Sequence, residues 1–88
     1  MHMAYLQTAD RLDLSFKCLG SLPSSINQLT TLVTLNLNNN HLRSLPDEFG
    51  ELAALQTLEF KHNDAWYLPE SFGQLAALQT CLLVDNCL

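Results

Sequence analysis

Leucine recurs every 23 residues along this chain, at Leu32, Leu55 and Leu78. On that period, residues 32–54 read LVTLNLNNNHLRSLPDEFGELAA, and residues 55–77 keep the pattern as LQTLEFKHNDAWYLPESFGQLAA. Residues 9–31 are a degraded copy, and residues 78–88 are a half copy that stops at the eleventh place. Each copy of such a repeat relies on its neighbours to cover its apolar residues, so the sequence predicts a stack of coils. We call these copies the first, second, third and half coil.

The bulk properties exclude several classes of protein. At 88 residues the chain fits one small domain, and its net charge of -5 with only four Lys or Arg argues against binding to nucleic acid. No apolar run approaches the roughly 20 residues of a membrane span, and residues 1–10 lack the features of a signal peptide. Three cysteines without paired spacings suit a reducing compartment. We therefore expect a cytoplasmic protein that does not bind membranes.

Four aligned columns carry a resemblance to a known family. Three Leu-Pro pairs stand in register with them and with three asparagines. The columns are Leu12/Leu35/Leu58/Cys81, Leu14/Leu37/Phe60/Leu83, Lys17/Asn40/Asn63/Asn86 and Leu22/Leu45/Leu68. The chain resembles the leucine-rich repeat family in its 23-residue Leu-Pro form, similar to the intracellular Ras-related group. It departs from the family pattern at Lys17, at Ala65 and at Cys81, which we expect to act as a small buried hydrophobe.

The predicted fold class is α/β, as a single leucine-rich repeat solenoid over residues 1–88. The resemblance implies a short right-handed horseshoe with a parallel β-sheet on the concave side and short α or 3-10 segments on the convex side. The alternation in Leu35-Asn36-Leu37 predicts a strand that buries both leucines. Pro23, Pro46 and Pro69 suit the first turn of each convex helix.

Asparagines at the ninth place end three of the predicted strands. The inward amides of Asn40, Asn63 and Asn86 are positioned to bond backbone groups that the turning chain leaves unpaired. Lys17 has no side-chain acceptor, so we expect the first turn to be looser than the others.

The outward residues of the strands form the candidate protein-binding surface. On the first three strands they are polar and mixed in sign: Arg11, Asp13, Thr34, Asn36, Asn38, Thr57, Glu59 and Lys61. Such a face fits a protein partner, and it equally fits a solvated sheet.

The tenth place of successive coils holds Cys18, His41, Asp64 and Cys87. Stacking would bring thiol, imidazole and carboxylate together in the order of a nucleophilic triad, or as zinc ligands that His62 would join. Two points argue against both the triad and the zinc site: these residues lie on an exposed rim without a pocket, and side chains on a flat row of strands diverge. The plainer interpretation is a row of solvated residues, and no cofactor is expected.

Trp66 and Tyr67 replace Arg43 and Ser44 of the preceding coil. Two interpretations compete. The aromatic pair folds over the gap that Ala65 leaves in a leucine column, or it is an exposed anchor for a partner.

The two ends of a repeat stack need covers. Residues 1–8 are a candidate N-terminal cap. At the other end, Leu82, Leu83 and Val84 form an open sheet edge. A longer solenoid, a homodimer through this edge, or a partner that supplies the missing half coil would each cover it.

The resemblance implies a non-enzymatic protein-protein interaction module with an unknown protein partner. Family members of this type look like intracellular scaffolds and regulators, some acting near small GTPases or kinases. The alternative is a structural self-assembling unit, and a remote alternative is a metal or thiol site at Cys18, His41 and Asp64.

Overall fold

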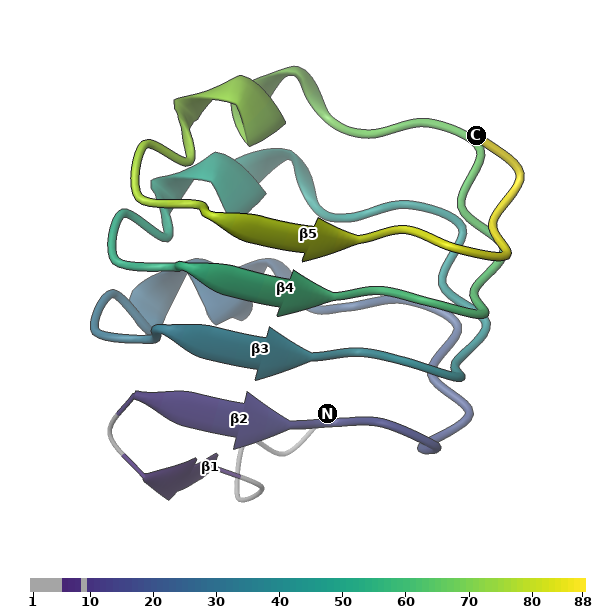
Figure 1. The fold of residues 1–88 in the computed structure, drawn as a ribbon, viewed down its shortest axis with the longest axis horizontal. Coiled ribbons are helices and arrows are strands. Elements are labelled where there is room, and N and C mark those ends of the chain that lie inside the picture. The colour runs from purple at the N-terminus through teal and green to yellow at the C-terminus, as the bar shows by residue number, and fades with distance from the viewer. Residues whose placement is uncertain (1–5, 9) are drawn as a thin grey trace.

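The computed structural model describes residues 6–8 and 10–88. They form one sheet of neighbouring strands in chain order, with three short 3-10 helices behind it (Figure 1). The elements are β1 (Leu6–Thr8), β2 (Arg11–Asp13), η1 (Ser24–Gln28), β3 (Thr34–Asn36), η2 (Asp47–Glu51), β4 (Thr57–Glu59), η3 (Glu70–Gln74) and β5 (Thr80–Leu82). None of the helices in the described part of the chain is long and apolar enough to cross a membrane.

Strands β2 to β5 are parallel and in strict register. Leu12 lies beside Leu35, Leu35 beside Leu58, and Leu58 beside Cys81. One coil therefore advances the chain by one strand, and the 23-residue period of the sequence becomes the spacing of the sheet. The predicted leucine-rich repeat solenoid is confirmed.

The core is a column of apolar side chains between the sheet and the helices. Leu35, Leu37 and Phe60 have no exposed surface, as the alternating pattern predicted. Phe49 of η2 stacks on Phe72 of η3, with ring centroids 6.3 Å apart and planes 7° apart. Burial fades toward the C-terminal end, where Phe72 and Cys81 are only partly buried.

The ninth-place residues Asn40, Asn63 and Asn86, which we call the asparagine ladder, each form hydrogen bonds with the backbone of the preceding coil. The Asn40 side-chain oxygen accepts hydrogen bonds from the backbone N–H groups of Lys17 and Leu19, each at 3.0 Å. Its Nδ2 donates to the carbonyl oxygens of Leu14, at 2.9 Å, and Leu37, at 3.0 Å. Each asparagine thus satisfies the turn of the coil before it. Lys17 offers no side-chain acceptor to the first turn, as expected, but Asn40 of the next coil bonds the backbone there.

The prolines precede the helices instead of lying inside the first turn, which corrects their predicted position. Pro23, Pro46 and Pro69 are the N-cap residues, with extended backbone at ψ between 148° and 154°. Proline fixes φ at the value this corner needs, and the amide it lacks is not required at a helix start. The convex segments are 3-10 helices of five residues each.

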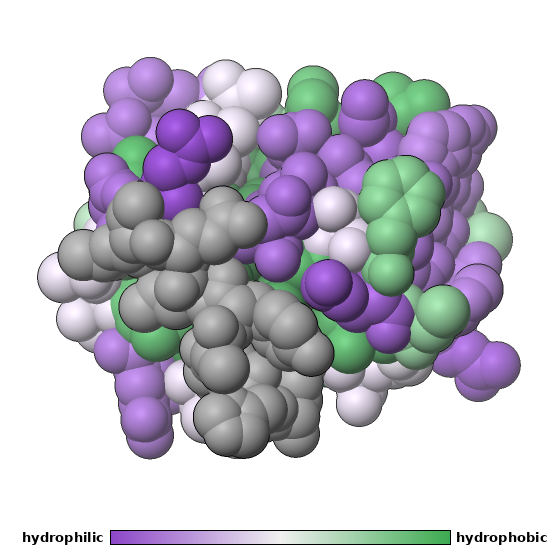
Figure 2. Space-filling view, turned by 90° about the horizontal axis from the view of Figure 1, so that it is seen from below, coloured by the Kyte–Doolittle hydropathy of each residue, from purple (hydrophilic) through white to green (hydrophobic). Residues whose placement is uncertain are grey.

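The N-terminal strand covers one edge of the sheet. β1 pairs antiparallel with β2, with a register irregularity between Leu6 and Thr8. This pairing is consistent with a cap at residues 1–8, although residues 1–5 lie outside the described part of the chain. Seen from this end, hydrophilic and hydrophobic residues are interspersed on the described surface (Figure 2).

Candidate protein-binding surface

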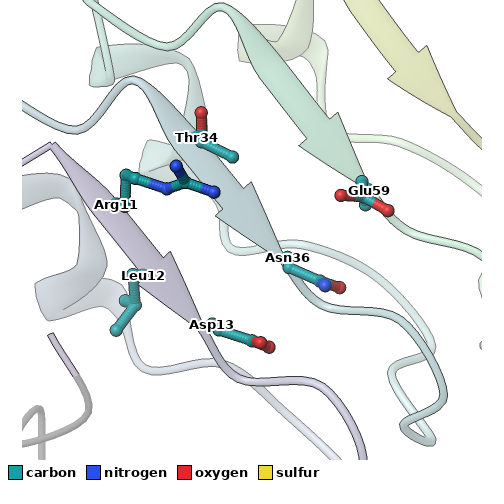
Figure 3. A pocket seen from close by; sticks show the side chains of 6 residues that line it. All are labelled: Arg11, Leu12, Asp13, Thr34, Asn36 and Glu59. Carbon is teal, nitrogen blue, oxygen red and sulfur yellow. The ribbon is translucent and has the colours of Figure 1, made fainter. Parts of the chain in front are cut away.

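The face of the sheet that points away from the helices is a polar surface with a shallow hollow. We call it the sheet face. The hollow is lined by Arg11, Leu12 and Asp13 of β2, Thr34 and Asn36 of β3 and Glu59 of β4 (Figure 3). Figure 3 shows the Arg11 guanidinium reaching toward Thr34, while Asp13, Asn36 and Glu59 stand in a row at the ends of three neighbouring strands. The parallel register therefore gathers five of the eight predicted residues around one hollow.

Asp13 is held in place by the residue that follows its strand. Its Oδ1 accepts hydrogen bonds from the Ser15 hydroxyl, at 2.6 Å, and from the Ser15 backbone N–H, at 2.9 Å. These bonds, together with the charge of Lys17, lower the pKa of the Asp13 carboxyl below its usual value, and burial opposes them weakly. Asp13 is therefore an exposed and oriented carboxylate that stays ionised at neutral pH.

Asn38 does not belong to the open surface, which corrects its predicted role. Only 8% of it is exposed. Its Nδ2 donates to Glu59 Oε1 at 3.0 Å, and its Oδ1 accepts from the Lys61 backbone N–H at 2.7 Å. Asn38 thus orients Glu59 and joins β3 to β4 from the sheet face. The other predicted residues on β4 and after it, Thr57 and Lys61, are half-buried on the same face.

The sheet face becomes apolar at its last strand. Leu82 and Leu83 are half-buried, and Val84 has 60% of its surface exposed. β5 pairs with β4 on one side and is the last strand of the sheet. The predicted self-association edge therefore is an open sheet edge with one exposed aliphatic side chain.

Backbone hydrogen bonds join the tenth-place residues to the preceding coil, and two of their side chains, His41 and Asp64, lie close together. The N–H groups of His41, Asp64 and Cys87 donate to carbonyl oxygens of the preceding coil. His41 Nδ1 lies 3.8 Å from Asp64 Oδ2, and both side chains are largely exposed. At the eighth place, His62 Nδ1 lies 2.9 Å from Asp85 Oδ2 instead of joining a ligand set with Asp64.

The structure does not assemble the triad or zinc site considered for this column. Among the described residues, no three His, Cys, Asp or Glu side chains are placed to hold a metal ion. Cys18 is exposed and has a left-handed backbone with φ of 55°. The two histidine-carboxylate contacts are exposed surface pairs, which contribute little to stability.

Trp66 and Tyr67 project from the surface. Trp66 is 65% exposed and Tyr67 is 49% exposed, and their rings meet edge to face at 5.3 Å. Ala65 is fully buried, its N–H bonded by the Asn86 side chain and its carbonyl by the Cys87 N–H. Because most of the Trp66 side chain is exposed, the structure favours the exposed pair over the cavity-filling interpretation. The exposed pair keeps the character of a candidate anchor.

The three cysteines are free, and they differ in exposure. Cys18 and Cys87 are exposed, whereas Cys81 lies partly buried against the core. Burial raises the pKa of the Cys81 thiol, so this side chain stays neutral and acts as the small hydrophobe expected.

Phe16 was missed as a surface residue. It follows β2, is 74% exposed and has φ of 56°, which is unusual for an aromatic residue. The same place in the later coils holds Asn39, His62 and Asp85, all with positive φ. The signal was in the sequence: a phenylalanine stands where three polar residues mark a left-handed turn, so it cannot serve the core.

The repeat pattern matches a known family over more than half of the chain. The family model described as Leucine rich repeat matches residues 30–88. The chain belongs to the leucine-rich repeat family. Among solved structures, it is similar to the Leptospira interrogans LRR protein LIC12759, with 27% sequence identity and a TM-score of 0.55. That match covers 85% of this chain and 31% of the other, so this leucine-rich repeat chain spans about a third of that protein's length. No curated protein matches the sequence.

Proposed function

We propose that this leucine-rich repeat protein is a non-enzymatic protein-interaction module that binds its partner across the sheet face. The family membership supports an interaction scaffold in general. The observation that carries the proposal is the hollow between β2 and β4, where a cation and two carboxylates from separate strands surround one concavity. Their charges lie far apart in sequence and are fixed by the sheet, so the surface is preorganised for a partner of complementary charge.

The charge pattern indicates how the partner is recognised. Arg11 offers a planar donor for a carboxylate or a backbone carbonyl. Asp13 and Glu59 stand two strands apart, about 9.6 Å at the usual strand spacing, and each is oriented by a neighbouring side chain. A partner with two cationic side chains at that spacing would pair with both carboxylates.

Free cysteines on the surface suit a reducing compartment, and we place the protein in the cytoplasm.

The experiment is affinity capture with charge-reversed baits. Proteins recovered by the natural chain should be lost with the double variant Arg11→Glu/Glu59→Lys, which keeps the net charge. They should be retained with Arg43→Glu/Glu51→Lys, a matched pair of exposed residues outside the sheet face. Direct binding of each recovered protein is then measured by calorimetry. Equal binding to both double variants would refute a role of the sheet face.

We propose self-association through β5 as a second candidate function. The open edge and the exposed Val84 support it, because an unpaired strand edge is a template for another chain. Two copies related by a two-fold axis would pair their last strands antiparallel. Light scattering at rising concentration should show a mass that saturates at twice that of the monomer, and Val84→Lys should restore the monomer. A monomer at millimolar concentration would exclude this candidate.

A further inference from the structure

The parallel register of the sheet arranges its outward side chains in rows that cross the strands. Asp13 lies beside Asn36, Asn36 beside Glu59, and Glu59 beside Leu82. We call these four residues the central row, and Figure 3 shows its first three members on neighbouring strands. At the usual strand spacing, Asn36, Glu59 and Leu82 lie about 4.8, 9.6 and 14.4 Å from Asp13. The central row therefore presents a carboxylate, an amide, a carboxylate and an aliphatic side chain at even steps.

Both carboxylates of the central row are held through one oxygen. The Ser15 hydroxyl and backbone N–H donate to Asp13 Oδ1, and Asn38 Nδ2 donates to Glu59 Oε1. These bonds leave Asp13 Oδ2 and Glu59 Oε2 as acceptors for a partner. Because the sheet fixes the distance between the two strands, the central row is a preorganised pair of anions for two cationic side chains.

Polar residues flank the central row. On the side where the strands begin, a second row is formed by Arg11, Thr34, Thr57 and Thr80. On the other side Lys61 follows β4 and is half-buried. The charges of Arg11 and Lys61 repel a partner's cations from both flanks, so those cations are directed to the central row. The third to the seventh place of a coil span about 13 Å, which accommodates one α-helix of about 10–12 Å diameter.

The steps of the central row match an α-helix better than an extended segment. Helix places i, i+4, i+7 and i+11 share one face and advance by about 6.0, 10.5 and 16.5 Å. If the helix is inclined by about 25° to the row, these places lie within about 0.6 Å of the successive strands. An extended segment repeats its face every 6.7 Å or so, and a polyproline II helix about every 9.3 Å, so neither meets every strand.

We propose that the sheet face binds an amphipathic α-helix of the partner, which lies across the strands along the central row. The helix has Lys or Arg at two places seven residues apart and an aliphatic residue four residues outside that pair. The two cations pair with Asp13 and Glu59, and the aliphatic side chain packs on Leu82. This inference rests on the proposed function, which places the partner on the sheet face, and it adds the partner's secondary structure and charge spacing.

The test measures binding of synthetic peptides to the full chain by calorimetry. Each helical peptide has about 18 residues and a lactam on the face away from the lysines, because short helices are marginal in water. In two peptides the lysines are seven residues apart, with a leucine four residues before or after the pair, so both helix directions are represented. At least one of them should bind. Moving one lysine to a spacing of five residues turns it away from the sheet and should weaken that binding about threefold.

Two matched variants of the protein locate the bound peptide. Glu59→Gln keeps the oxygen that Asn38 bonds and removes one charge, so it should weaken the better seven-residue peptide about threefold. Glu70→Gln makes the same charge change on η3, behind the sheet, and should leave the affinity unchanged. Replacing the leucine of the peptide by alanine should weaken binding to the natural chain and not to Leu82→Ala.

A further peptide decides between a helix and an extended segment. It keeps the seven-residue spacing but has prolines between the lysines and no lactam, so it cannot form a helix. Equal affinity for the two lysine spacings, or tighter binding of the proline peptide, would overturn the helix inference and leave the sheet face as the binding surface. So would the absence of peptide binding if the captured proteins are lost with Arg11→Glu/Glu59→Lys. Captured proteins that are retained by this double variant would refute the sheet face itself.

Discussion

Replacing Asn40 by alanine should be among the most destabilising polar-to-alanine changes in this protein. The residue is 4% exposed and joins two coils through bonds to Lys17, Leu19, Leu14 and Leu37. Leu14 and Leu37 have no exposed surface, so their carbonyl oxygens lose a partner that water reaches poorly. The Lys17 amide lies in an exposed residue and can be hydrated.

The magnitude follows from counting the groups left without their partner. A buried polar group that loses its hydrogen bond costs about 1–3 kcal/mol, and two carbonyls and one partly buried amide are affected. Carbonyls with a second bond, and any water that enters, reduce the sum, so we expect a loss of about 3 kcal/mol. A domain of 88 residues has a free energy of unfolding of about 4–13 kcal/mol. The variant should therefore remain folded only narrowly.

Urea unfolding followed by far-ultraviolet circular dichroism measures this loss. With a slope of about 1–3 kcal/mol per molar urea, the midpoint should fall by about 1–3 M. Asn27→Ala is the matched control, because its amide makes one exposed bond to Glu51 and its loss should cost about 0.5 kcal/mol. The loss in unfolding midpoint for Asn86→Ala should lie between those of Asn40→Ala and Asn27→Ala, since the partners of Asn86 lie nearer the C-terminal end of the stack. If Asn40→Ala and Asn27→Ala unfold at the same midpoint, the ladder does not stabilise the stack as argued.

Three further changes test other parts of the structure. Trp66→Ala should lower the free energy of unfolding by less than about 1 kcal/mol, since the ring is mostly exposed; a larger loss in the urea melt would restore the cavity-filling hypothesis. In the native protein, a thiol reagent at pH 8 should modify Cys18 and Cys87 before Cys81, whose pKa is raised by burial; three equal rates would contradict this. The lowered pKa of Asp13 stabilises the folded state above the unfolded value of 3.8, so the stability advantage over Asp13→Asn should be present at pH 6 and disappear as the pH falls through the folded pKa; an advantage that persists at pH 2 would refute it.

The period of the sequence predicted the fold because it determines the register. Once Leu12, Leu35 and Leu58 are aligned, each strand lies beside its equivalent and the sheet face follows. The inward asparagines were predictable for the same reason, since a ninth-place amide meets the same turn in every coil. The strand register and the inward asparagines recur in every coil, so the repeat pattern of the sequence is enough to predict them.

What the sequence did not predict depends on contacts between coils. Lys17 was assigned a loose turn because the ladder was thought to act within a coil, whereas Asn40 reaches back to it. Asn38 was placed on the open surface, but its bonds to Glu59 and to the Lys61 backbone bury it. The sequence left open whether Trp66 fills space beside Ala65 or projects as an anchor, and its ring is mostly exposed. These three outcomes depend on contacts of individual side chains, about which the period carries no information.

The ladder gives the stack a direction, and that direction explains why its two ends are unlike. Each asparagine bonds the turn of the coil before it, so Asn40 bonds the turn that holds Lys17. The backbone amide that each asparagine bonds recurs at the same place of every coil. The amides of Leu42 and Ala65 are bonded by Asn63 and Asn86, and the equivalent place after β5 is Leu88, which is 57% exposed. At the first end of the described sheet β2 is paired with β1, whereas at the other end β5 has one edge unpaired and Leu88 is exposed.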